Sequence, residues 1–561
     1  NSRPTPTPRH NFDAKVSRYD LSDTYLSPFR EAVMGGGAAG VMCSYNALNG
    51  VPTCASDFLR SVLRTSWGFD GYVTSDSGAV RDIWQYHNYT KTEPEAVAAA
   101  LKARTDVDSG GTLEKQCSDA PYMLAIPKAI EQGLLSLNTL NDAVRNALNI
   151  RFRLGLFDPV ETQPYWHVPP EVVQSDPHVR LAQSASEQGL VLLENDEGLL
   201  PFKAGLQVAV IGPSANDTSV LVGDYIGQIC PADLDDQSCV QTIFEAVRLR
   251  NKRDGGETIY RMGCSTEGKD TSGIAAAAQA AQAADVVVLV LGTDLNVESE
   301  ANDRDSIGLP GVQQKLFDAV YAVNPRTAVV LTHGGALAIP EIKASGAAVL
   351  DALMPGVFGA RAVASALFGD FSPGGRLPYT AYSHDFVRSV EMTNMGMLPS
   401  KSSPGRGYRY FLGTPLWPFG HGLSYSSFEL SWTRAPPKEV GNDTPGHVVE
   451  CAIRVINTGA VEASAAVLLF GLPSEGPIQR RLVSFGRTEK LAPDAAETLH
   501  MSFPLDSTLG LALADGRSGT VSSKPGRWDL AATLGDPKAQ TLNAELHITG
   551  SARVVDELPP T

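Results

Sequence analysis

The sequence predicts a multidomain α/β protein in which two β/α regions precede an all-β region. The chain has 561 residues, several times the length of a typical domain. Short apolar runs alternate with stretches of helical periodicity over most of its length, which is typical of parallel β/α architecture. From about His447 onward the apolar residues recur with period two, which predicts antiparallel strands.

Composition and charge exclude several classes of protein. With 43% hydrophobic and 19% charged residues the chain is neither disordered nor collagen-like. Its 46 Lys and Arg against 62 Asp and Glu give a net charge of −16 without a basic run, so no nucleic-acid partner is expected. The longest apolar run, 286–291, has six residues, far below the roughly 18 that a membrane-spanning helix needs.

Residues 1–157 form the first predicted region. The runs 40–45 and 71–76 resemble buried strands that end in polar residues. Residues 55–66 have apolar positions at helical spacing, and 127–156 predict one or two further helices. A complete (β/α)8 barrel takes about 250 residues, so this region is too short to be one.

Residues 158–185 contain five prolines and little periodicity, so we predict a linker there. A second β/α domain follows over 186–425, where 206–212 and 285–292 have the near-continuous apolar character of strands buried on both faces. Residues 426–561 predict a small antiparallel β-sandwich.

Carboxylates follow two of the predicted strands, where parallel β/α enzymes place reactive groups. Asp76 ends the strand over 71–75, and both Glu298 and Glu300 come shortly after Gly292. Two separated carboxylates on one cleft could cleave a glycosidic bond, one as nucleophile and one as proton donor. The alternative is that each is a solvated or helix-capping acid. His333, after another buried strand, is expected to be a packed residue with satisfied hydrogen bonds.

Other reaction types have little support in the sequence. No G-x-S-x-G, H-E-x-x-H or Walker motif occurs, and no Cys or His spacing indicates a metal site. The turn at Gly212-Pro213-Ser214 only weakly resembles a dinucleotide-binding turn. No metal, nucleotide or other cofactor is therefore expected.

Cysteines and sequons favour an exported protein. Of seven cysteines, the pairs Cys43/Cys54 and Cys230/Cys239 have spacings that suit local disulfides, although spacing does not establish pairing. The odd total leaves at least one free thiol. N-x-S/T sequons at Asn88, Asn216 and Asn442 would be glycan acceptors in a secreted eukaryotic chain.

Several longer motifs follow one another along nearly the whole chain. They are Arg9-His10-Asn11-Phe12-Asp13-Ala14, Tyr19-Asp20-Leu21, residues 41–52, residues 71–76, residues 189–195, Gly374-Gly375-Arg376-Leu377-Pro378, residues 405–410 and residues 418–425. With these motifs the chain resembles the family-three glycoside hydrolases, and within them the fungal-type β-xylosidase branch. The resemblance implies the C-terminal part of a (β/α)8-type barrel over 1–157, then an α/β sandwich domain over 186–425, then a fibronectin-III-like β-sandwich over 426–561.

The resemblance assigns roles to the carboxylates. Asp76 matches the nucleophile that forms a covalent glycosyl-enzyme, and Glu300 matches the proton donor. Glu298 is the second candidate for the donor, because this stretch varies most within the family. The two carboxyl groups would need a separation of about 5–5.5 Å, so a loop of the second domain must close over the barrel mouth. Partial burial of the acid would favour its protonated form.

The same resemblance identifies sugar-binding residues. Met42 and Tyr45 match residues beside the nucleophile, and Arg9 matches a ligand of the sugar hydroxyls. The alternative is that Met42 and Tyr45 only pack in the hydrophobic core at the end of a strand. Ser77 and Ser109 stand where the xylosidase branch usually has cysteines, which implies that a family disulfide is absent here.

The implied activity is the release of xylose from the non-reducing ends of xylo-oligosaccharides, or of another sugar from a β-linked oligosaccharide, by a secreted extracellular enzyme. β-Glucosidase and α-L-arabinofuranosidase activities are alternatives within the family, and a homodimer is an open expectation. The family's early barrel strands have no counterpart in this sequence, so we expect a fragment of a longer chain or, as another alternative, a non-catalytic remnant. A nucleotide-binding α/β protein is the third hypothesis.

Overall fold

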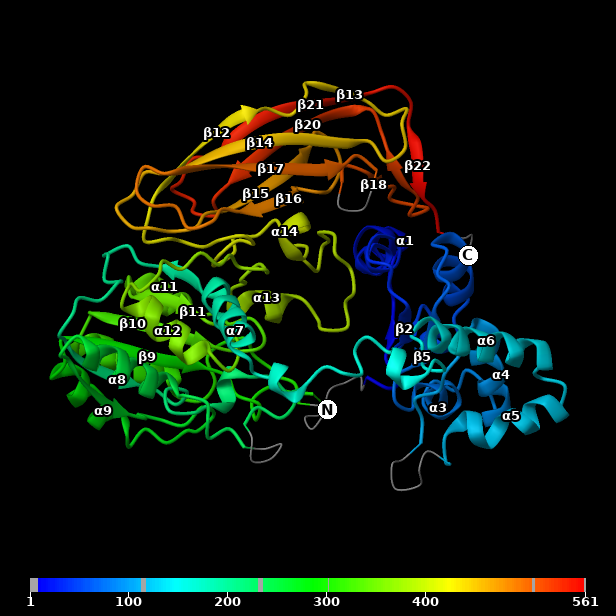
Figure 1. Cartoon of the computed structure of the whole chain (residues 1–561), viewed down its shortest axis with the longest axis horizontal. Helices are drawn as coiled ribbons and strands as arrows, with labels where there is room; N and C mark the ends of the chain where they lie inside the picture. The colour runs from blue at the N-terminus through cyan, green and yellow to red at the C-terminus, as the bar shows by residue number, and fades with distance from the viewer. Residues whose placement is uncertain (1–8, 112–117, 231–235, 301, 507–509, 559–561) are drawn as a thin grey trace.

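The computed structural model describes residues 9–111, 118–230, 236–300, 302–506 and 510–558. The chain forms three regions, and in Figure 1 the all-β region lies above the two β/α regions. We refer to residues 9–157 as the first region, 190–425 as the second region and 426–558 as the third region. Cys117, one of the seven cysteines, lies outside the described residues.

The first region contains the two predicted strands as a parallel pair. β2 and β5 are paired in register from Gly40 with Tyr72 to Cys43 with Ser75. We predicted that both strands are buried, which is wrong for β2, because Met42 is 56% exposed. The elements are β1 Asp13–Ala14, α1 Arg18–Asp20, η1 Leu21–Tyr25, α2 Ser27–Arg30, η2 Glu31–Gly35, β2 Gly40–Cys43, β3 Ala47–Leu48, β4 Val51–Pro52, η3 Thr53–Ala55, η4 Leu59–Ser66, β5 Tyr72–Ser75, α3 Ala79–Gln85, α4 Glu93–Ala103, α5 Pro121–Glu131 and α6 Leu137–Arg153.

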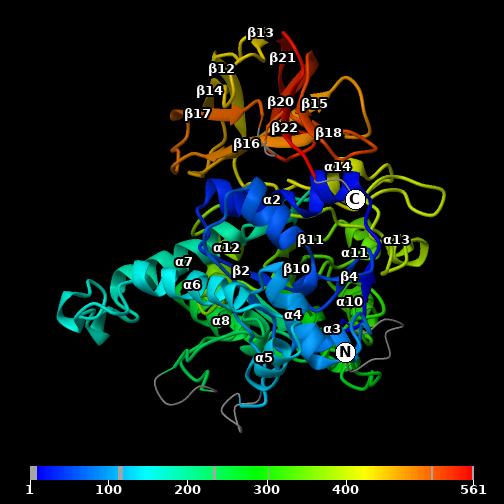
Figure 2. The same cartoon turned by 90° about the vertical axis from the view of Figure 1, so that its right-hand side faces the viewer.

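The predicted linker is only partly irregular. Two short turns, η6 Val160–Thr162 and η7 Pro170–Val172, lead into helix α7, Asp176–Gly189. The prediction of a linker as far as residue 185 is therefore wrong from Asp176 onward. Pro177, which we counted as a linker signal, occupies the first turn of α7, where a missing N–H costs nothing. Figure 2 shows the segment between α6 and α7 projecting from the body of the protein.

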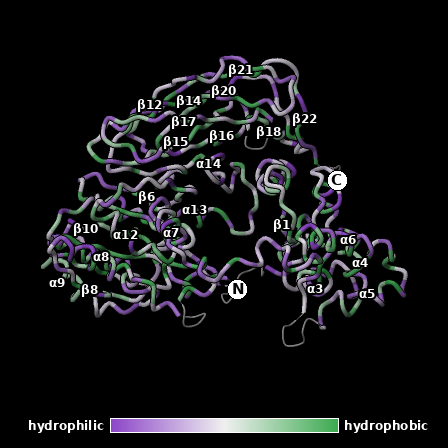
Figure 3. The backbone as a smooth tube through the Cα atoms, in the orientation of Figure 1, coloured by the Kyte–Doolittle hydropathy of each residue, from purple (hydrophilic) through white to green (hydrophobic). Residues whose placement is uncertain are grey.

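The second region is a six-stranded sheet in the order β6-β11-β10-β9-β7-β8, parallel except for β6. All seven residues of β9 are buried, as its apolar run predicts, because helices cover both faces of the sheet. Figure 3 shows hydrophobic residues along the strands of this sheet. The elements are β6 Val191–Glu194, β7 Gln207–Ile211, η8 Ser219–Leu221, α8 Ile243–Arg253, β8 Glu257–Arg261, α9 Ile274–Gln282, β9 Val286–Gly292, α10 Gln313–Val323, β10 Thr327–Thr332, α11 Pro340–Ser345, β11 Ala348–Asp351, α12 Gly359–Leu367, α13 His384–Ser389 and α14 Gly407–Tyr410.

The third region is built from strands, as the period-two pattern predicts. Sheets β12-β14-β17 and β13-β21-β20-β15-β16 share one apolar core. A small sheet, β18-β19-β22, lies near the first region, where Arg18 donates to the carbonyl oxygens of Ser518 and Leu558. The strands are β12 Phe428–Arg434, β13 Glu439–Gly441, β14 Val448–Asn457, β15 Ala466–Pro473, β16 Arg481–Arg487, β17 Ala496–Pro504, β18 Leu513–Ala514, β19 Val521–Ser523, β20 Gly526–Thr533, β21 Leu542–Thr549 and β22 Arg553–Asp556.

Within the described residues, no helix combines the length and apolar character needed to cross a membrane. The same part of the chain holds no group of three or more His, Cys, Asp or Glu side chains placed to bind a metal ion.

Candidate functional site

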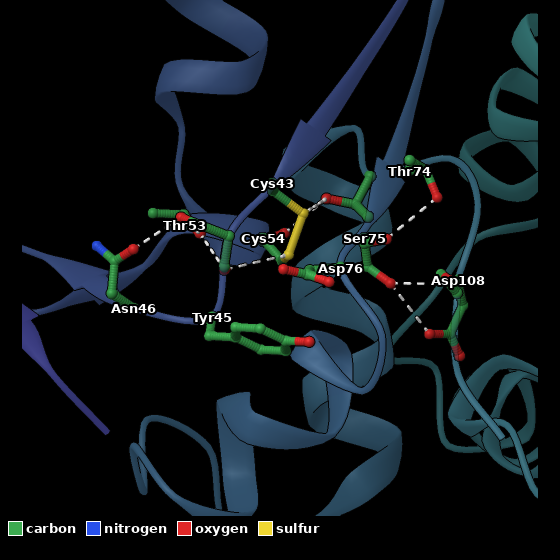
Figure 4. Close-up of a disulfide and its surroundings, with 12 residues drawn as sticks. Cys43, Tyr45, Asn46, Thr53, Cys54, Thr74, Ser75, Asp76 and Asp108 are labelled. Carbon is green, nitrogen blue, oxygen red and sulfur yellow. Dashed lines mark hydrogen bonds between the residues drawn. A yellow bond between two sulfur atoms is a disulfide. The ribbon is translucent and has the colours of Figure 1, made fainter. Parts of the chain in front are cut away.

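Asp76 lies where the strands β2 and β5 end side by side. Its backbone N–H donates to the carbonyl oxygen of Cys43 over 2.9 Å, and one of its carboxylate oxygens accepts the N–H of Ser77 at 2.7 Å. Because the strands are parallel, the residues that follow β2 meet Asp76 at the same edge (Figure 4). The structure therefore confirms that a carboxylate, Asp76, lies at the end of this strand.

A disulfide holds the segment that follows β2. Cys43 and Cys54 are bonded, with their Cα atoms 5.1 Å apart, and Figure 4 shows the bridge beside Asp76 and Tyr45. Cys230 and Cys239 form the second predicted pair. Both pairings suggested by the spacing are thus confirmed, and the thiols of Cys264 and Cys451 are free and buried.

Tyr45 is held against Asp76 by its surroundings. Its pKa is raised to about 12, first by burial and then by its hydrogen bond to the Asp76 carboxylate. The ring of His10 lies 4.4 Å from the ring of Tyr45, and His10 Nδ1 is 2.7 Å from a carboxylate oxygen of Asp82. His87 Nε2 lies 2.8 Å from the Tyr45 carbonyl oxygen. These contacts orient the Tyr45 hydroxyl toward the carboxylate.

Arg9 joins this cluster to the second region. Its guanidinium donates to Glu300 Oε1 over 2.8 Å, and its Cζ lies 5.1 Å from the centre of the Tyr45 ring. The hydroxyl of Tyr225 donates to the other oxygen of Glu300, and Asp224 accepts the backbone N–H of Glu300 at 2.5 Å. Four of the predicted site residues, Arg9, Tyr45, Asp76 and Glu300, therefore form one connected group.

The environment of Glu300 differs from our expectation for a proton donor. We expected partial burial, but the side chain is 44% exposed. The hydrogen bond from Tyr225 and the one from Arg9 lower the pKa of Glu300. The structure therefore differs from the partly buried acid that we expected, and the two donors favour the charged carboxylate.

Glu298 occupies a different environment from Glu300. Although burial acts to raise its pKa, the Gly335 N–H, Arg304 and Thr293 together lower it. The carboxylate lies 2.6 Å from Arg304 Nε, 2.8 Å from Thr293 Oγ1 and 2.9 Å from the Gly335 nitrogen. These partners all belong to loops of the second region, so the structure brings Glu300, rather than Glu298, to Arg9.

Met42 lies outside the connected group. It lines an apolar hollow of about 360 Å³ with neighbours such as Phe29, Phe58 and Trp67, whereas Tyr45 and Asp76 are not part of that lining. Its predicted contact with a sugar stays a prediction.

Ser77 and Ser109 face each other. Their hydroxyl oxygens are 3.4 Å apart, and the Gly78 N–H donates to the Ser109 carbonyl oxygen. The two positions that the family resemblance paired in sequence are therefore adjacent in space.

Sequence reasoning missed Tyr225, Asp224 and the packing of His10. Nothing in the pattern around Tyr225 points to Glu300, which lies 75 positions later. His10, by contrast, stands in the motif that contains Arg9 and could have been singled out. His333 is buried and hydrogen-bonded at both ring nitrogens, as predicted.

Comparison with known proteins identifies the family. Residues 10–150 match the model described as glycosyl hydrolase family 3 N terminal domain, and residues 190–425 match the family 3 C-terminal domain. The chain is 35% identical over 579 residues to the "Probable exo-1,4-beta-xylosidase bxlB" of Aspergillus fumigatus, covering 98% of this chain and 71% of that protein. It is 34% identical to the "Beta-xylosidase/alpha-L-arabinofuranosidase 2" of Medicago sativa subsp. varia, covering 90% of this chain and 66% of that protein.

A solved structure shares the whole architecture of the described chain. The "GH3 exo-beta-xylosidase (XlnD) in complex with xylobiose aziridine activity based probe" has a TM-score of 0.88 and 29% sequence identity, and the match covers 98% of this chain and 71% of that one. The matched family models, the identity over nearly the entire chain and this likeness in fold together show that the chain belongs to glycosyl hydrolase family 3.

Proposed function

We propose that the protein is a retaining exo-glycosidase that releases xylose from the non-reducing ends of xylo-oligosaccharides. The observation that carries the proposal is the contact of Arg9 with both Glu300 and Tyr45, because Tyr45 in turn lies beside Asp76 (Figure 4). Two carboxylates from different regions thereby belong to one site. The names of the fungal and plant relatives, exo-1,4-beta-xylosidase among them, support xylose as the sugar.

In the proposed mechanism Asp76 is the nucleophile. Its carboxylate attacks the anomeric carbon while the glycosidic C–O bond breaks and Glu300 gives its proton to the leaving oxygen. Glu300 then takes a proton from water, whose oxygen attacks the same carbon and releases Asp76 and xylose. Two displacements retain the configuration, and neither step requires a metal or a cofactor.

The charged state of Glu300 fits this mechanism if the substrate displaces Arg9. A sugar hydroxyl that accepts a hydrogen bond from Arg9 would compete with Glu300 for the guanidinium. Loss of the Arg9 contact raises the pKa of Glu300, because one of the two donors that favour its ionised form is removed. Arg9 would then both bind the sugar and allow the acid to take up its proton.

Hydrolysis of aryl β-xylosides and aryl β-glucosides by this chain tests the proposal. We expect xyloside cleavage that Asp76→Asn abolishes without loss of the folded state. A xylobiose-configured aziridine should label Asp76, which peptide mass spectrometry would locate. Undiminished turnover by Asp76→Asn would contradict it, as would absence of both turnover and labelling in this chain and in a version extended at its N-terminus.

The second candidate function is α-L-arabinofuranosidase activity. Two relatives from Medicago sativa subsp. varia, each 34% identical to this chain, carry both activities in their names. Aryl α-L-arabinofuranoside in the same assay separates the candidates: a larger kcat/KM on it than on the β-xyloside would favour the arabinofuranosidase.

We also propose finer divisions of the chain. Residues 1–157 would be the C-terminal part of a (β/α)8-type barrel, supported by the parallel pairing of β2 and β5. Residues 186–425 would be an α/β sandwich domain and 426–561 a fibronectin-III-like domain, supported by the two sheets around one core. Limited proteolysis that cuts first within 158–175 would agree with these boundaries.

We propose that the protein is secreted, because its two disulfides are typical of proteins in oxidising compartments. Asn88 and Asn216 are exposed and would accept a glycan. The buried side-chain amide of Asn442 donates to the carbonyl oxygens of Ser523 and Ser551, so we expect no glycan there. Light scattering after size exclusion would test the proposed homodimer.

A further inference from the structure

His333 lies at the end of β10, between the loops that follow the two neighbouring strands β9 and β11. Its side chain is 1% exposed. Nδ1 is 2.7 Å from the carbonyl oxygen of Gly335, and Nε2 is 3.0 Å from a carboxylate oxygen of Asp351. Each ring nitrogen therefore faces an oxygen acceptor.

The Asp351 carboxylate accepts hydrogen bonds from several groups. The same oxygen that faces His333 accepts the N–H of Leu353 at 3.0 Å, and the other accepts the hydroxyl of Tyr379 at 3.3 Å. His333 therefore lies between a carboxylate oxygen and a carbonyl oxygen, and only the imidazolium can donate to both. Although burial opposes the charge, Asp351 and the Gly335 carbonyl raise the pKa of His333, and Glu298 contributes in the same direction.

Gly335 connects this buried pair to the loop that carries Glu300. Its N–H donates to Glu298 Oε1 over 2.9 Å, while its carbonyl oxygen accepts from His333. Glu298 also pairs with Arg304 and accepts from Thr293. A Cβ at Gly335 would lie 2.8 Å from both Arg304 Nη2 and Glu298 Oε2, so the network leaves no room for a side chain there.

We propose that His333 is a positioning residue: its doubly donating ring fixes the Gly335 peptide, which fixes Glu298 and thereby the loop that presents Glu300. The effect passes through backbone and side-chain hydrogen bonds, and His333 itself does not touch the substrate. Naming Glu300 as the acid rests on the proposed function, whereas the mechanical link between His333 and residues 293–300 does not.

Hydrogen exchange followed by mass spectrometry tests the link directly. In His333→Gln, where one donor is lost, we expect amide exchange in peptides covering residues 293–300 to accelerate about tenfold. His421→Gln is the matched control, because His421 is also buried and its Nε2 lies 2.9 Å from the carbonyl oxygen of Leu193, away from this loop. Unchanged exchange in His333→Gln, or equal acceleration in both variants, would overturn the proposal.

A second pair of variants leaves His333 in place, should His333→Gln fail to fold. Gly335→Ala should accelerate exchange over 293–300, because the new methyl group displaces Glu298 or Arg304. In Gly334→Ala the nearest atom is the flexible end of Met354 at 3.1 Å, so little change is expected there. Identical behaviour of the two alanine variants would contradict the link through Gly335.

The protonation state of the ring has its own measurement. With ¹⁵N-labelled histidine, we expect His333 to show protons on both ring nitrogens at neutral pH, and an unprotonated nitrogen there would overturn the doubly donating ring. As pH rises and the ring loses a proton, amide exchange over residues 293–300 should accelerate in the parent protein. In His333→Gln this additional dependence on pH should be absent. Within the described residues, two carboxylates act on the charge of His333: Asp351, which contacts the ring, and Glu298. Tyr379 is a third titratable group and donates to Asp351.

Kinetics connect the positioning to catalysis. His333→Gln should lower kcat more for aryl xylosides with poor leaving groups than for those with good ones, because only the former need a well-placed acid. If Glu300→Ala shows no such dependence, the assignment of the acid fails while hydrogen exchange still decides the role of His333.

Discussion

The guanidinium of Arg9 lies 2.8 Å from Glu300 Oε1 although 291 positions separate the two residues. The same guanidinium lies over the ring of Tyr45, which lies beside Asp76 (Figure 4). One side chain of the first region therefore connects the proposed nucleophile with the proposed acid, which a loop of the second region carries.

Removal of a donor from Glu300 should change the pH dependence of activity. The Tyr225 hydroxyl is the largest cause of the lowered pKa of Glu300, so Tyr225→Phe should raise that pKa toward its ordinary value. The acid then keeps its proton to higher pH, and the basic limb of the kcat/KM profile should move to higher pH. Tyr165→Phe is the control, since Tyr165 is 85% exposed and Tyr225 86%. A downward shift would contradict the assignment.

Glu300 and Glu298 should respond differently to replacement. Glu300→Ala should retain activity on substrates with good leaving groups and lose about 100-fold or more on poor ones, because general acid catalysis is removed. Glu298→Ala should mainly destabilise the protein, by about 1–3 kcal/mol, since it leaves Arg304 without its carboxylate. Leaving-group series and thermal unfolding of both variants measure this. The reverse pattern would make Glu298 the acid.

Cysteines introduced at positions 77 and 109 should form a disulfide. The facing hydroxyls of Ser77 and Ser109, 3.4 Å apart, indicate that paired thiols can approach each other there. The double variant Ser77→Cys/Ser109→Cys should lose two mass units on oxidation and gain about 2–4 kcal/mol of stability. Each single cysteine variant is the control and should keep a free thiol. Two free thiols in the oxidised double variant would show that the backbone geometry is unsuitable.

Asp23 should be a major determinant of how the regions hold together. Its buried carboxylate pairs with Arg409 of the second region and Arg481 of the third. Asp23→Asn should cost about 3–5 kcal/mol in free energy of unfolding, because it leaves the buried Arg481 and the largely buried Arg409 without their charge partner. Asp57→Asn, which breaks an exposed pair with Arg60, should cost less than about 1 kcal/mol. Urea unfolding compares the two, and equal losses would contradict the buried role.

Local patterns in the sequence predicted much of the fold. The apolar run over 285–292 predicted the buried strand β9, and the runs ending at Ser75 and Tyr45 predicted the strands that carry Asp76 and its neighbours. The spacing of Cys43 and Cys54 suited the disulfide that formed. Such features depend on residues within about a dozen positions of one another, where strand period, helix period and chain reach leave few alternatives.

The choice between Glu298 and Glu300 shows where local pattern ends. Both follow β9 by a few residues, and no periodicity distinguishes them. Glu298 accepts from Gly335, and Glu300 accepts from Arg9 and Tyr225, all of which come from distant segments. The exposure and lowered pKa of Glu300 depend on the same long-range contacts, so the expectation of a buried acid was wrong for a reason that the local sequence does not contain.

The sequence by itself therefore determined the succession of strands and helices, the position of Asp76 at a strand end and the family motifs around it. Only the tertiary structure decided which glutamate meets Arg9 and that Tyr225 binds it. The physical reason is that secondary structure follows from neighbouring residues, whereas charge pairing and burial depend on which surfaces pack together across hundreds of positions.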